Sequence, residues 1–121
     1  MHWIYLIRHC QAEGQEPFAS LTDEGYRQAK VLADLLGTAG ISKIVSSPYK
    51  RAVHSATPLA TQLALSIDTD ERLIERALSD SPVVNWRDHL SAAFTDPDFA
   101  LPGGESSRAA MARGRAAVDA A

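Results

Sequence analysis

The chain of 121 residues has a single cysteine, Cys10, and therefore cannot form an intrachain disulfide. One unpaired cysteine is typical of a reducing compartment, so we expect a cytoplasmic protein. No stretch approaches the roughly 20 apolar residues that span a bilayer, and the apolar start is too short for a signal-peptide core. The net charge is −3 and no basic run occurs. We therefore expect neither a membrane nor a nucleic-acid partner.

The composition is that of an ordinary globular protein, with 45% hydrophobic and 22% charged residues. A chain of this length is typical of one domain with its own core, and we assign residues 1–121 to a single domain. No internal repeat, linker or low-complexity tract divides the sequence.

The first informative stretch is a short apolar run, Ile4–Ile7, followed directly by Arg8 and His9. Such a run predicts a strand that is buried on both faces. Because ligands bind at the carboxyl ends of strands in open α/β sheets, Arg8 and His9 indicate an anion site with a titratable or nucleophilic partner. From this stretch alone, a strand end with two solvated polar residues is an equally good interpretation.

The remaining pattern alternates between helices and strands. Thr22 is a predicted N-cap and Gly37 a predicted stop, while Ser47 and Pro48 have the pattern of an N-cap followed by a first-turn proline. In order, we expect a strand over 4–7, a helix over 22–37, a strand over 41–45, a helix over 49–63, a strand over 65–69, short helical pieces between 71 and 101, and a last helix from 105 onward. This alternation favours an α/β sheet with crossover helices.

Four separated segments then combine into one resemblance. They are Leu6-Ile7-Arg8-His9, the run from Leu21 to Ala29 (LTDEGYRQA), the run from Ser46 to Ala52 (SSPYKRA), and Gly104-Glu105-Ser106. In order and rough spacing they resemble the histidine phosphatase superfamily, the phosphoglycerate-mutase-like group of phosphoryl-transfer enzymes. The resemblance implies a three-layer α/β/α fold and a phosphomonoester hydrolase that acts on a small phosphorylated substrate.

Physical chemistry supports that function. Arg8 and Arg51 both follow predicted strands, and the forked donors of arginine suit the oxygens of a phosphate group. A neutral imidazole is a competent nucleophile, and the resemblance implies that His9 forms a transient phosphohistidine. Neither step needs a metal or another cofactor, and the sequence has no cluster of metal ligands.

The leaving alkoxide needs a proton. The resemblance implies a glutamate after the third strand in a context like Leu-x-Glu, which Leu73-Ile74-Glu75 matches. Glu75 is therefore the candidate general acid. Glu71 is the competing carboxylate, and a surface ion pair is an alternative role for either of them.

Three further residues are candidates for the pocket. Gln15 follows His9 in the next loop, and His54 lies three residues beyond Arg51 on one predicted helical face. Cys10 stands where the superfamily usually has glycine. A cysteine-dependent phosphatase would need an arginine six residues later, but that position is Glu16, so we interpret Cys10 as a tolerated small side chain.

The sequence also departs from the superfamily near its end. The superfamily pattern includes a second histidine, in a His-Gly pair after a central strand, yet the last histidine here is His89. We therefore expect a C-terminally truncated chain, a sheet without one central strand, and impaired activity. Rearranged strands or a strand borrowed from a partner chain are alternatives. Because an unfilled position exposes backbone and apolar surface, we expect self-association.

Two other functions stay open. One is a phosphate-binding module that retains Arg8 and Arg51 but does not catalyse hydrolysis. The other is phosphoryl transfer of the phosphoglycerate-mutase type, although the compact middle region shows no sign of the insertions that mutases carry. The identity of the substrate does not follow from the sequence.

Overall fold

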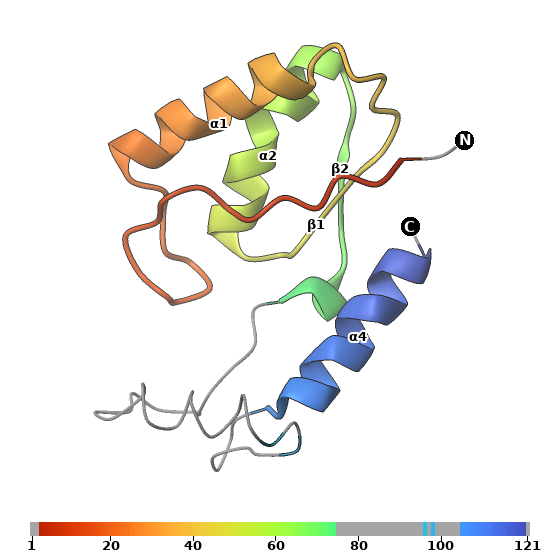
Figure 1. The fold of residues 1–121 in the computed structure, drawn as a ribbon. Helices are drawn as coiled ribbons and strands as arrows, with labels where there is room; N and C mark the ends of the chain where they lie inside the picture. The colour runs from red at the N-terminus through yellow and green to blue at the C-terminus, as the bar shows by residue number, and fades with distance from the viewer. Residues whose placement is uncertain (1–2, 75–95, 97, 99–104, 121) are drawn as a thin grey trace. The chain divides into compact units, whose positions relative to one another are not determined.

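The computed structural model describes residues 3–74, 96, 98 and 105–120, which fall into two compact units, residues 1–71 and 72–121. The elements are, in order, α1 (Asp23–Leu36), β1 (Ile44–Ser46), α2 (Lys50–Leu63), β2 (Ile67–Thr69), the 3-10 helix η1 (Glu71–Leu73) and α4 (Ser107–Ala120) (Figure 1). The expected helical pieces between 71 and 101 lie mostly outside the described residues, and η1 is the described part of that region. None of the described helices is long and apolar enough to cross a membrane.

The sheet of the first unit consists, among the described residues, of the parallel pair β1 and β2 with α2 as their connection. Ile44 lies opposite Ile67 and Ser46 opposite Thr69. The predicted crossover is thus confirmed, although both strands are shorter than expected. Strand β2 begins at Ile67 and not at residue 65, because the Leu65 amide donates to the Ala60 carbonyl at 2.9 Å and closes the end of α2. Ala64 adopts a left-handed φ of 55° at this helix end.

Helix α1 begins where the sequence predicts. The Thr22 hydroxyl oxygen accepts a hydrogen bond from the Gly25 amide at 3.0 Å, and two acidic residues follow in the first turn. The residues of α1 that are buried are small: Gly25, Ala29 and Ala33. Ala29 packs with Cys10 and Leu21 in the core, and α1 lies against α2 (Figure 1). Tyr26, which follows Gly25 in α1, is 40% exposed.

Helix α2 begins later than predicted. Its N-cap is Tyr49, which makes no side-chain capping bond, and its first residue is Lys50. The prediction that Ser47 caps the helix is wrong because its hydroxyl accepts from the Tyr49 amide at 3.2 Å and closes a local turn before the helix. One side of α2 buries Arg51, Ser55 and Leu59, which are spaced four residues apart and so share a face.

The segment Ile4–Ile7 contradicts the prediction of a buried strand. The structure assigns it no strand, and Ile4 and Leu6 are 56% and 76% exposed. A strand requires a neighbour for its backbone hydrogen bonds, and the only strands among the described residues, β1 and β2, pair with each other. The apolar residues of this segment are therefore in contact with solvent.

The second unit is organised by Arg113 of α4. Its guanidinium makes a two-pronged ion pair with Glu105, at 2.5 and 2.6 Å, and also donates to the carbonyls of Arg72 (2.8 Å) and Ile74 (2.5 Å). The helix itself is capped by the Ser106 hydroxyl, which accepts from the Ala109 amide at 3.1 Å. A single planar cation thus holds the segment after β2 against α4.

Candidate functional site

The segment that carries Arg8 and His9 is attached to α2 by a buried hydroxyl. The Cys10 amide donates to Ser55 Oγ at 2.8 Å, and the Ser55 hydroxyl donates to the Arg51 carbonyl at 2.7 Å. Cys10 and Ser55 are only 9% and 4% exposed. Ser55 therefore gives the buried Cys10 amide the partner that it needs, and fixes the chain directly after His9.

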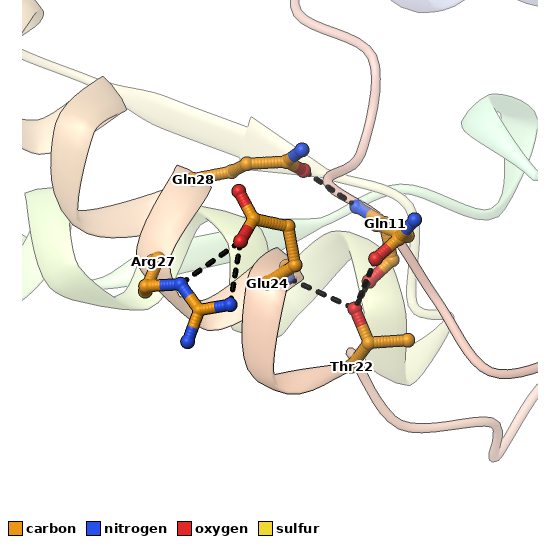
Figure 2. A network of polar contacts seen from close by, with 6 residues as sticks. Gln11, Thr22, Glu24, Arg27 and Gln28 are labelled. Carbon is orange, nitrogen blue, oxygen red and sulfur yellow. Dashed lines mark hydrogen bonds and ion pairs between the residues drawn. The ribbon is translucent and has the colours of Figure 1, made fainter.

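The next residue, Gln11, is held by α1 (Figure 2). Its amide donates to Gln28 Oε1 at 2.9 Å, its carbonyl accepts from the Thr22 amide at 3.0 Å, and its side-chain oxygen accepts from the Thr22 hydroxyl at 2.7 Å. The approach is so close that a Cβ atom at Gly25 would collide with the Gln11 carbonyl. This contact explains why the LTDEG run has glycine at its last position.

The half-buried His9 has one ring nitrogen occupied by a defined partner. His9 Nδ1 lies 2.7 Å from the Cys10 carbonyl oxygen. Because a carbonyl oxygen only accepts hydrogen bonds, Nδ1 carries the proton and donates it. In the neutral ring the lone pair then belongs to Nε2.

An open hollow of about 370 Å³ lies beside His9, between the first segment and α1. The first segment contributes residues 7–10 to its wall, which include Arg8, His9 and Cys10. Helix α1 contributes six side chains: Glu24, Arg27, Gln28, Val31, Leu32 and Leu35. Three of the seven residues expected at the site therefore lie together on one hollow.

Arg51 has a different environment. It is 2% exposed, its Nη1 donates to the carbonyls of Gln15 (3.1 Å) and Glu16 (3.0 Å), and its guanidinium lies 4.9 Å from the centre of the Tyr49 ring. Arg51 is not part of the wall of this hollow. It is joined to the His9 segment through its own carbonyl, which accepts from Ser55. Its observed contacts hold the loop that follows His9 onto the start of α2.

The other candidates are placed as follows. Gln15 has an exposed side chain, and its carbonyl is the group that Arg51 contacts. His54 Nδ1 lies 3.2 Å from the Tyr26 hydroxyl, so His54 links α2 to α1. Glu75 lies outside the described residues, and its competitor Glu71 begins η1.

Sequence reasoning missed three residues that shape this site, namely Ser55, Arg27 and Gln28. The signal for Ser55 was present, because it follows Arg51 by four residues on a predicted helix and so shares its buried face. The signal for Arg27 and Gln28 was weaker, since two polar residues in a helix ordinarily indicate a solvated surface. Within the described parts of the chain, no group of three or more potential ligands could hold a metal ion.

Comparison with known proteins gives a consistent result. The model of the histidine phosphatase superfamily (branch 1) matches residues 4–121. A probable phosphoglycerate mutase of Proteus mirabilis is 31% identical over 121 residues, which cover 85% of this chain and 55% of that protein. A putative phosphoserine phosphatase of Hydrogenobacter thermophilus is 32% identical over 87 residues, covering 66% of this chain and 43% of the relative.

The solved structure of a mycobacterial glucosyl-3-phosphoglycerate phosphatase superposes with a TM-score of 0.79 and 29% identity, over 92% of this chain and 59% of that one. The same enzyme has also been solved with inorganic phosphate. The superposition and the parallel β1–β2 pair confirm the predicted α/β fold class, of the phosphoglycerate-mutase-like kind. The chain spans about half the length of these matched proteins, between 43% and 59% of each.

The role of Ser55 can be tested by comparing two hydroxyls of α2. Ser55→Ala removes the partner of the buried Cys10 amide and should lower the free energy of unfolding by about 1–3 kcal/mol in urea denaturation. It should also speed hydrogen exchange at the Cys10 amide. The control is Thr57. Its hydroxyl also donates to the carbonyl four residues earlier (2.8 Å), but this residue is exposed. Thr57→Ala should change stability by no more than about 0.5 kcal/mol. Equal effects of the two substitutions would contradict the assigned role of Ser55.

Proposed function

The chain belongs to the histidine phosphatase superfamily, and from that membership we propose that it is a phosphomonoester hydrolase acting through a phosphohistidine intermediate. The observation that carries this proposal is the 2.7 Å hydrogen bond from His9 Nδ1 to the Cys10 carbonyl. It holds the imidazole in the tautomer whose lone pair is on Nε2, which is the form that can attack phosphorus. Ser55 supports this geometry by fixing the Cys10 backbone.

In the proposed first step, His9 Nε2 attacks the phosphorus atom and the bond to the ester oxygen breaks. The leaving alkoxide takes a proton from Glu75. In the second step a water molecule attacks the phosphorus, the P–N bond breaks, and inorganic phosphate leaves. The Glu75 carboxylate takes the proton of that water, which restores both residues. The role of Glu75 rests on its sequence context alone.

The proposed phosphate ligands are Arg8 and Arg51. Arg8 is exposed on the same hollow as His9, so it can contact a dianionic phosphate bound there. We propose that Arg51 adds positive charge from the start of α2, while the carbonyls of Gln15 and Glu16 stabilise its buried position. Gln15, Cys10 and His54 are then residues around the pocket, and His54 acts through its contact with Tyr26.

A second candidate is phosphoryl transfer between substrates, because one matched relative is a probable phosphoglycerate mutase. A third is phosphate binding without turnover. The second histidine of the superfamily pattern has no counterpart after His89 in this sequence. We therefore propose that the turnover of this chain is slow. In both catalytic proposals the substrate is a small phosphorylated molecule.

We predict that the chain releases phosphate from p-nitrophenyl phosphate and that both His9→Ala and Arg8→Ala lower the rate about 100-fold or more, because each removes a group that acts on the transferring phosphoryl. Arg115→Ala, on an exposed arginine of α4, is the matched control and should leave the rate unchanged. An unchanged rate in His9→Ala would rule out His9 as the nucleophile. Calorimetric binding of vanadate without hydrolysis would identify a non-catalytic module, and phosphoryl transfer to glycerate in place of water would identify a mutase.

We also propose that the chain self-associates through residues 3–6. Trp3, Ile4, Tyr5 and Leu6 are between 48% and 76% exposed, which is unusual for four consecutive large apolar residues, and association would remove them from water. Sedimentation equilibrium should show a concentration-dependent dimer that Leu6→Lys dissociates, because it places a charge in the contact. Phe18→Lys, at an exposed apolar position outside this segment (85%), should not dissociate it. A wild-type monomer throughout the micromolar range would contradict this proposal.

A further inference from the structure

The hollow beside His9 has two chemically different ends along α1. Glu24, Gln28, Val31 and Leu35 follow one another at intervals of three or four residues and therefore form one stripe on the helix surface. The stripe is polar in the first half of the helix and apolar in the second. At a rise of 1.5 Å per residue, it extends over about 16 Å.

The polar end carries a net positive charge. Arg27 is held by the carboxylate of Glu24, with its Nε at 2.9 Å and its Nη2 at 2.6 Å from Oε2 (Figure 2). Arg8 lies on the opposite wall. Two guanidinium groups against one carboxylate favour an anionic ligand at this end.

The apolar end is unusually exposed. Val31 and Leu35 are 57% and 71% exposed on α1, and Ile7 on the facing segment is 51% exposed. The three side chains line one hollow and leave apolar surface in water, so an apolar group that entered between them would be stabilised by the hydrophobic effect. The volume of about 370 Å³ is within the ordinary range for small-molecule sites.

We propose that this hollow selects phosphomonoesters whose leaving group is apolar, such as an aryl or alkyl phosphate. The phosphate lies at the polar end near Arg8 and His9, and the apolar body lies along Val31 and Leu35. This selectivity rests on the proposed hydrolase function and deepens it by naming the substrate class. The charge at one end and the exposed apolar surface at the other match the two parts of such a molecule.

The test compares two substrates and two variants. Leu35→Gln removes apolar surface from the hollow. Met111→Gln is the matched control, because Met111 is also a large, exposed apolar residue (62%) but lies on α4. We expect Leu35→Gln to lower kcat/KM for 1-naphthyl phosphate about 5- to 20-fold, mainly through KM, as the loss of one apolar contact does. The value for glycerol 3-phosphate should change less than about twofold, and Met111→Gln should affect neither substrate.

Binding of 1-naphthyl phosphate, measured by calorimetry, separates this proposal from the hydrolase function. Binding that Leu35→Gln weakens, with no turnover of either substrate, would support the hollow and reject the hydrolase. Turnover of both substrates that Leu35→Gln leaves unchanged, or lowers equally for both, would support the hydrolase and overturn the proposed selectivity. All variants are compared at a concentration where sedimentation gives the same species.

Discussion

The geometry of the candidate site depends on one buried hydroxyl. Ser55 accepts a hydrogen bond from the Cys10 amide and donates one to the Arg51 carbonyl, so it joins the segment that carries Arg8 and His9 to the helix that carries Arg51. A buried amide without a partner costs more than a typical hydrogen bond contributes, so this contact strongly disfavours other positions of the Cys10 backbone. The Cys10 carbonyl belongs to the same residue, and it is the group that orients the imidazole of His9. The attachment of the Cys10 backbone and the orientation of the His9 ring therefore both depend on the hydrogen bond to Ser55.

A second constraint acts from the other side. Gln11 is held by Thr22 and Gln28 of α1, and only glycine at position 25 allows its carbonyl to come so close. The residues directly after His9 are thus fixed by both helices of the first unit, whereas Ile4–Ile7 has no neighbouring strand among the described residues. This difference explains why the residues after His9 are held by hydrogen bonds to both helices while the apolar residues before it are exposed. Since no strand lies beside Ile4–Ile7 in the part of the chain that the structure describes, its apolar side chains are exposed there.

Several features were predictable from the sequence because their causes are local. Thr22 caps α1 through its own hydroxyl, and β1, α2 and β2 form a crossover unit that the alternation of apolar segments indicates. The boundaries were less predictable, since Ser47 uses its hydroxyl for a turn and Leu65 completes the end of α2. The prediction of a strand at 4–7 was wrong because a strand forms only where a second segment pairs with its backbone. An apolar run identifies one of the two segments and not its partner. Among the site residues, Arg8, His9 and Cys10 were found through a motif. Ser55 and Gln28 bond to the distant amides of Cys10 and Gln11. The helical spacing of Ser55 from Arg51 indicates a shared buried face, but it does not identify that distant partner.

The central claim is that His9 carries the phosphoryl group during turnover, and trapping the intermediate tests it most directly. The chain is mixed with p-nitrophenyl phosphate, quenched at alkaline pH because phosphohistidine is labile in acid, and digested for mass spectrometry. We predict a phosphoryl group on the peptide that contains His9, attached to the imidazole, and none in His9→Gln treated in the same way. A phosphoryl group on a serine or on Cys10, or hydrolysis that proceeds with no phosphorylated peptide while His9→Gln retains full activity, would contradict the assignment.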